Sequence, residues 1–160
     1  MMRSFPFISF LIGVLSFRSL SAFAAPDFRS GDWDVTIDLD SISSSANELT
    51  NEKSTIGVFC KHGKGIIVSF DIVPAIPDKS LAKTTIQVSG GNKTPTSVAV
   101  KFGRLGNFIQ TEKGDQASIV IGKLLEGGSL TVEYEKRLLI YPSDGFRHIF
   151  GVMRKLCLLI

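Results

Sequence analysis

The chain has 160 residues with 18 basic and 15 acidic side chains. Arg3, an apolar run and then Ala22 and Ala24 in an A-x-A pattern predict that residues 1–24 are a secretory signal peptide, cut after Ala24. Removing it takes away Arg3 and Arg18, so 16 basic groups face 15 acidic ones, and this balance gives no reason to expect a nucleic-acid partner.

The alternative for the first residues is a membrane anchor. The apolar run covers only residues 5–17 and ends at Arg18, whereas a membrane-spanning helix needs about 20 apolar residues. We therefore expect no integral membrane segment after cleavage. The remaining 136 residues (160 less 24), at 25–160, suit one β-rich domain that buries about two-thirds of its unfolded surface.

The exported part begins with an alternating segment at residues 31–38, which predicts a half-buried strand. Its apolar positions are Trp33, Val35 and Ile37, and the nearby aspartates are Asp32, Asp34, Asp38 and Asp40. The aspartates resemble a calcium loop only loosely, because the glycine and the distal glutamate of an EF-hand are missing. They are interpreted as a solvated face. Residues 42–52, rich in serine and asparagine, are predicted to be a loop.

Two hairpins are expected next. Residues 55–61 and 65–72 are short apolar runs around the turn KHGKG, which predicts a β-hairpin with Cys60 near its end. A phosphate-binding loop is disfavoured there because the Walker spacing and a following helix are lacking. Two prolines make residues 73–81 irregular, and the runs at 83–88 and 96–102 predict a second hairpin.

The last third changes to a helical period. A short helix is predicted at residues 115–126, capped by Asp115 and ended by two glycines. Two strands follow at 129–135 and 136–141. The segment SDGFRHIFGVMRKLC at 143–157 predicts an amphipathic helix, with Ser143 as its cap. Its apolar positions are Phe146, Ile149, Phe150, Met153 and Cys157, and its basic positions are Arg147, His148, Arg154 and Lys155.

The two cysteines, Cys60 and Cys157, both lie in the exported part. An even count in an oxidising compartment predicts one disulfide between them. Two buried thiols are the alternative. Strands followed by helices indicate an α+β fold. We expect an antiparallel, sandwich-like sheet to which the disulfide fastens the C-terminal helix.

No group of residues predicts catalysis or metal binding. His62 falls in a turn and His148 on a polar helix face, without the partners that a nucleophilic triad needs. Cys60, His62 and Cys157 lack the spacing and the fourth ligand of a structural zinc site. Three acidic residues, Glu126, Glu133 and Glu135, are interpreted as a solvated edge. We expect no cofactor, no metal and no enzymatic activity.

The chain resembles small exported bacterial proteins of the VasI type, associated with type VI secretion, and more loosely the invasion-associated locus B family. The resemblance rests on the G-x-W-x-V strand at 31–35, on the apolar strand ending in Cys60, on LLEGGSLTV at 124–132 and on the closing helix that ends in a cysteine. The chain departs from locus B proteins in lacking a cysteine after the tryptophan strand, and residues 73–115 match neither pattern. The resemblance implies a periplasmic or secreted accessory protein, or a virulence-associated protein that contacts a host, without catalysis.

Three functional hypotheses follow. The first is a non-enzymatic exported protein that binds another protein. The second is a module that binds a small molecule or a cell-envelope glycan in a groove lined by Trp33, Phe59 and Phe70. The third is an enzyme with an unrecognised site at His148 or at the glutamates.

Overall fold

The computed structural model describes residues 28–39, 41–50, 53–61, 64–71, 81–91, 93–104, 107–112 and 114–159, with side chains as far as Cys157. The expected signal peptide, His62 and the two prolines of the irregular segment lie outside these ranges. In the described residues, no helix is long and apolar enough to cross a membrane.

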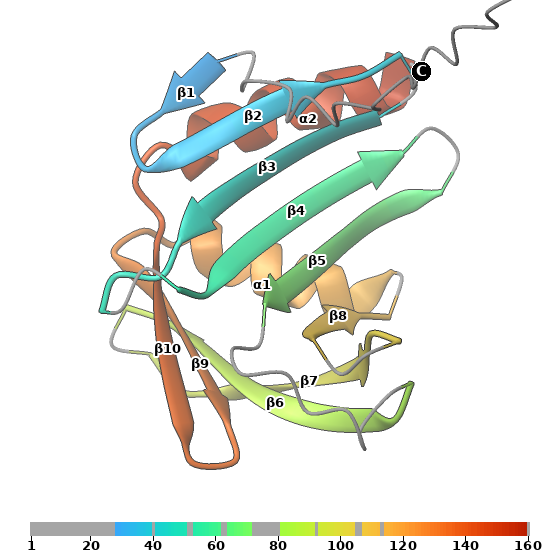
Figure 1. Cartoon of the computed structure of the whole chain (residues 1–160). Helices are drawn as coiled ribbons and strands as arrows, with labels where there is room; N and C mark the ends of the chain where they lie inside the picture. Colours follow the sequence, from blue (N-terminus) through green and yellow to red (C-terminus); the bar gives the residue numbers. More distant parts are fainter. Residues whose placement is uncertain are drawn as a thin grey trace, which may run out of the picture.

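Ten strands in the described part of the chain form one antiparallel sheet in the order β1-β2-β3-β4-β5-β8-β7-β6-β9-β10 (Figure 1). The strands are β1 (Phe28–Ser30), β2 (Trp33–Ile37), β3 (Ser41–Asn47), β4 (Thr55–Lys61), β5 (Gly65–Asp71), β6 (Lys83–Gly90), β7 (Thr96–Phe102), β8 (Phe108–Thr111), β9 (Ser129–Tyr134) and β10 (Arg137–Pro142). Two helices accompany them, α1 (Asp115–Leu125) and α2 (Phe146–Leu159). The predicted α+β fold with an antiparallel, β-rich sheet is confirmed. All ten described strands belong to one continuous sheet.

One face of this sheet is buried from β2 to β9. The register aligns Val35, Ser44, Val58 and Val68 of four neighbouring strands in one row, and all four are buried. Both helices cover this face: α2 contacts β1 to β4, and α1 contacts β5, β6, β7 and β9 (Figure 1). The core therefore lies between the sheet and a layer of two helices.

The loop predicted at residues 42–52 is wrong for most of its length, because β3 occupies Ser41–Asn47. Serine disfavours strands in general, but β2 and β4 pair with both edges of this segment and satisfy its backbone. Ser44 and Ala46 are buried under α2, where their small side chains leave room for the helix. Tertiary packing thus overrides the local preference.

The two hairpins and the short helix α1 are confirmed at β4–β5, β6–β7 and Asp115–Leu125. The predicted caps are wrong. Gly114, and not Asp115, is the N-cap residue of α1. Helix α2 starts at Phe146, two residues later than a cap at Ser143 would place it. The Ser143 hydroxyl donates to the Gly128 carbonyl oxygen at 2.7 Å, so it holds the chain against the end of the α1–β9 connection.

The N-terminal end of α2 packs against the β1–β2 turn. Gly145 and Gly31 both have positive φ, and a side chain on Gly145 would collide with the Ser30 backbone. Glycine therefore permits a close approach here. The Trp33 indole N–H donates to the Pro142 carbonyl oxygen at 3.2 Å, and its ring contacts Phe146 with centroids 4.7 Å apart.

The rest of α2 is fastened to β3 and β4. Midway along the helix, the Ser44 hydroxyl donates to Met153 Sδ at 3.4 Å. Near the C-terminal end, Cys157 forms a disulfide with Cys60 across 97 residues of sequence, with the Cα atoms 6.4 Å apart, which confirms the predicted bond. In the chain-entropy model, closing a loop of this length stabilises the fold by about 4 to 5 kcal/mol.

Both tyrosines of the chain are buried. Burial raises the pKa of Tyr134 to about 12, and its hydroxyl donates to Glu135 Oε1 at 2.8 Å. Burial, followed by the negative charges of Glu48 and Asp71, also raises the pKa of Tyr141. Among the described residues the Tyr141 hydroxyl finds no hydrogen-bond partner.

These two phenols predict alkaline destabilisation. Unfolded tyrosine loses its proton near pH 10, whereas the folded chain keeps both phenols neutral, so the unfolded state binds fewer protons above this pH and stability falls towards pH 12. In Tyr141→Phe the fall should become less steep by up to about 1.4 kcal/mol per pH unit. Because the substitution removes a buried hydroxyl that has no described partner, the variant at neutral pH should be as stable as the parent or about 1 kcal/mol more stable. Urea unfolding followed by circular dichroism over this pH range measures both effects. An unchanged slope together with lower stability at neutral pH would contradict the assignment.

Candidate functional site

The three aromatic residues predicted to line a groove do not share a surface. Trp33 and Phe70 are fully buried in the core, in contact with Phe146 and Tyr141. Phe59 is 38% exposed on the opposite face of the sheet. The reason is the alternation of strand side chains, which directs Phe59 away from the face that its neighbour Cys60 occupies.

A different cavity lies on the outside of the helical layer, where the end of α1 meets α2. We call it the basic groove; its volume is about 440 Å³. Its lining residues are Leu125, Arg147, Phe150, Gly151, Arg154 and Lys155. Leu125 and Phe150 are half-buried and apolar, whereas the three cationic residues are exposed. The groove thus combines an apolar floor with a positively charged rim.

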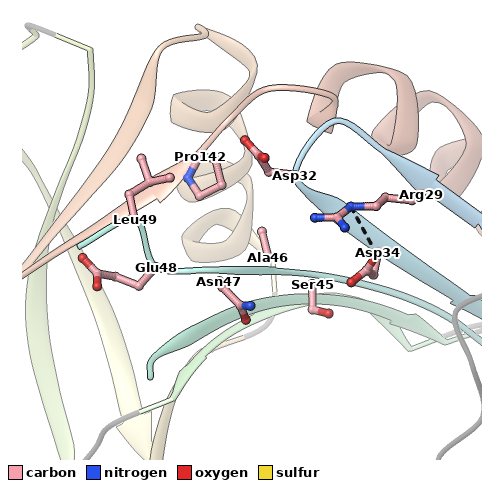
Figure 2. A pocket seen from close by; sticks show the side chains of 9 residues that line it. All are labelled: Arg29, Asp32, Asp34, Ser45, Ala46, Asn47, Glu48, Leu49 and Pro142. Atoms are coloured by element: carbon pink, nitrogen blue, oxygen red, sulfur yellow. Dashed lines mark ion pairs between the residues drawn. The ribbon is translucent and has the colours of Figure 1, made fainter. Parts of the chain in front are cut away.

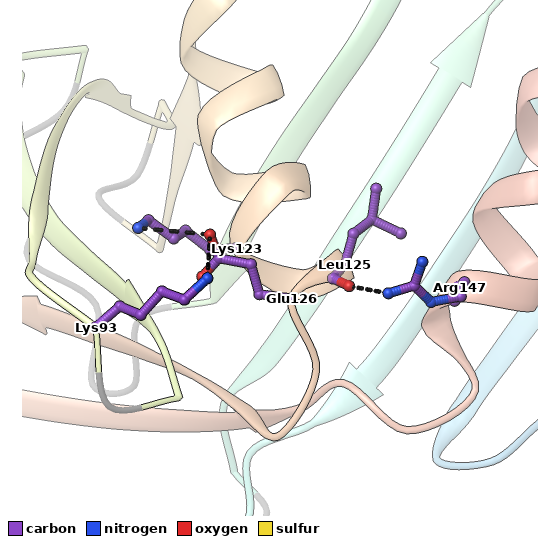
Figure 3. A network of polar contacts seen from close by, with 5 residues as sticks. All are labelled: Lys93, Lys123, Leu125, Glu126 and Arg147. Carbon is purple, nitrogen blue, oxygen red and sulfur yellow. Dashed lines mark hydrogen bonds and ion pairs between the residues drawn. The ribbon is translucent and has the colours of Figure 1, made fainter.

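The period of α2 builds this groove. The helix directs Phe146, Ile149 and Met153 into the core. Of the residues between them, Arg147 and Gly151 are exposed, whereas Phe150 is half-buried against the core. The Arg147 guanidinium donates to the Leu125 carbonyl oxygen at the C-terminal end of α1, which joins the two helices (Figure 3). A cation is favourable at this negative end of a helix.

Glu126, the acidic residue that follows Leu125, forms ion pairs with lysines outside the groove. Glu126 Oε1 lies 3.3 Å from Lys93 Nζ and 3.9 Å from Lys123 Nζ, as Figure 3 shows. Its charge is therefore balanced by these two lysines and not by the arginines of the groove. The groove keeps a positive field.

A second, smaller cavity of about 220 Å³ lies beside β1, β2 and the end of β3 (Figure 2). We call it the polar pocket, and it is lined by Arg29, Asp32, Asp34, Ser45, Ala46, Asn47, Glu48, Leu49 and Pro142. Arg29 Nε lies 3.6 Å from Asp34 Oδ1, and both side chains are largely exposed. Such a pair contributes at most about 1 kcal/mol.

Glu48 has a structural role at the rim of the polar pocket. Its side chain is almost fully buried, and Oε1 accepts hydrogen bonds from the Thr50 hydroxyl at 2.6 Å and from the Ile140 backbone N–H at 3.1 Å. The Leu49 N–H donates to the Ile140 carbonyl oxygen at 2.8 Å. These bonds attach the connection between β3 and β4 to β10. In the sheet order, β10 is far from both β3 and β4.

Replacing Glu48 by Ala should therefore lower the free energy of unfolding by about 1 to 3 kcal/mol, because the half-buried Ile140 N–H and the Thr50 hydroxyl lose their common acceptor. Glu48→Gln keeps an acceptor oxygen and should recover most of this loss. Asp34→Ala, which removes another carboxylate from the same pocket, is the control and should cost less than about 1 kcal/mol. Urea unfolding midpoints compare the three variants. Equal losses in Glu48→Ala and Asp34→Ala would refute the role of Glu48.

The groups considered for catalysis and metal binding are dispersed. His148 is exposed on α2, Glu133 is exposed on β9, and Glu135 accepts from Tyr134. Within the described ranges, no three His, Cys, Asp or Glu side chains are grouped so that they could hold a metal ion.

Sequence reasoning noted the basic residues of α2 but missed the groove, because Leu125 joins it from another helix. The available signal was the polar face of residues 146–157, which carries Arg147, His148, Arg154 and Lys155 and no acidic residue.

Comparisons of the chain with protein-family models, with curated proteins and with solved structures find no match.

Proposed function

We propose that this chain is an exported, non-enzymatic accessory protein that binds another protein through the basic groove. The groove itself is the observation that carries the proposal: an apolar floor of Leu125 and Phe150 beside three exposed cations. Apolar contact supplies affinity at interfaces, and complementary charge supplies association rate and specificity. The resemblance to VasI-type proteins favours a partner in a secretion system or on a host surface.

The disulfide supports the exported location. Such bonds persist in oxidising compartments and are rare in the cytosol. Together with the signal peptide predicted at residues 1–24, the Cys60–Cys157 bond favours a periplasmic or secreted protein.

A small anionic molecule is the second candidate occupant. The volume of the groove, about 440 Å³, falls within the range of about 300 to 1,000 Å³ typical of ligand pockets. A groove open to solvent and rimmed by long, exposed cationic side chains is more typical of a protein interface, where arginine is enriched.

Site-specific photo-crosslinking in the producing cell tests the proposal. A photoreactive residue in place of Lys155, in the groove, should yield an adduct of the mature chain with a second polypeptide. The same residue in place of Lys136, an exposed lysine in the β9–β10 turn, is the matched control and should yield none. Adding Arg154→Glu should reduce the adduct at position 155. Equal adducts at both positions, or none at either, would refute protein binding through the groove, and an adduct without polypeptide mass would favour the small molecule.

A further inference from the structure

We propose that the segment received by the basic groove is an acidic, amphipathic α-helix of the partner, lying alongside α2 for about two turns. This inference rests on the proposed function and adds the chemistry and conformation of the docking segment. Four features of α2 support it: the spacing of its cations, Gly151, the charge of its exposed face and the burial of its apolar face.

The cations follow the axis of α2. Arg147 and Lys155 are eight residues apart, which corresponds to about 12 Å at 1.5 Å per residue, and Arg154 lies beside Lys155. A helix laid along this line would bring acidic side chains seven or eight positions apart opposite the two ends of the row. The same period gives the partner an apolar stripe at spacings of three and four, which would face Leu125 and Phe150.

Gly151 stands in the middle of the row and permits a close approach. It is exposed, and no atom lies within 4 Å of the position that a Cβ would occupy. Glycine within a helix costs about 1 kcal/mol relative to alanine, so local stability does not explain its presence. Without a side chain at this position, the backbone of a second helix can approach α2 more closely.

The positive charge on the exposed face of α2 favours an acidic partner. Residues 146–157 contain no aspartate or glutamate, and Glu126 at the end of α1 already pairs with Lys93 and Lys123. Within the described residues, the positive charge of Arg154 and Lys155 is thus left for a partner, and an acidic segment would complement it.

An anionic membrane surface is the main competing occupant, because basic amphipathic helices commonly bind membranes. Such helices insert their apolar face among the lipids. In α2 that face is already occupied: Phe146, Ile149 and Met153 are fully buried against the sheet, and Cys157 is bonded to Cys60. Among the side chains of α2 that the structure describes, as far as Cys157, only the small apolar floor of the groove is left, so a protein helix fits better than a lipid surface.

The test is a titration of the oxidised mature chain with a designed peptide of about four helical turns, with leucines at spacings of three and four and glutamates seven positions apart. A scrambled peptide of the same composition and vesicles of anionic phospholipid are the competing probes. Amide NMR shifts locate the binding site, and fluorescence anisotropy measures affinity at low and at physiological salt. The amphipathic peptide should shift Gly151, Arg154 and Lys155, bind at least about tenfold more tightly than the scrambled one, and weaken as salt rises.

Two groove variants and one control sharpen the test. Arg154→Glu should weaken the peptide by about tenfold or more by reversing a charge. Gly151→Leu should also abolish the shifts, while its free energy of unfolding is unchanged or higher because leucine favours helices, so misfolding cannot explain the loss. Lys136→Glu changes an exposed charge outside the groove and should bind like the parent.

The contradicting results are also distinct. Equal binding of the scrambled peptide, no shifts at the groove, or tighter binding to vesicles than to the peptide would overturn the acidic helix as the occupant. The crosslinking experiment is independent of this peptide. An adduct at position 155 in a chain that ignores the peptide would retain the proposed function and reject only the helical, acidic character of the segment.

Discussion

The attachment of α2 to strands β1 to β4 is the interaction on which the rest of the structure depends. Three contacts spaced along the helix hold it: Trp33 with Phe146, Ser44 with Met153, and the Cys60–Cys157 bond. The helix contacts β1 to β4, whereas α1 contacts β5, β6, β7 and β9, so without α2 the apolar face of β2 to β4 would be exposed to water. Long-range sequence pairs thus complete a core that no local segment could form.

The same attachment determines what α2 presents to solvent. Because its apolar residues are buried in the core, its basic face is directed outward. The hydrogen bond from Arg147 to the Leu125 carbonyl oxygen joins this face to the end of α1. The basic groove is therefore a product of the tertiary fold and not of either helix alone. A binding surface built on two packed helices needs little ordering of the backbone on association, which lowers its entropic cost.

Sequence patterns predicted most of this architecture, and the failures have physical causes. The alternation at 31–38 and the glycine turn before residue 65 specified strands because half-buried strands need that period. The loop predicted at 42–52 was wrong because β2 and β4 pair with both edges of residues 41–47, and local composition cannot reveal such long-range pairing. Ser143 failed as a cap because Gly128 offers its hydroxyl another partner. The aromatic groove failed because Trp33 and Phe70 point into the core, and the basic groove was missed because it joins two separate helices.

We infer that the chain is exported and that the Cys60–Cys157 disulfide then keeps α2 fastened to the sheet. The most direct measurement is the mass of the protein recovered from an oxidising compartment, with and without reduction before alkylation. We expect a mature chain beginning at Ala25, in which both Cys60 and Cys157 resist alkylation until they are reduced. Two thiols that react without reduction would contradict the bond, and an uncleaved residue 1–24 segment would contradict the processing.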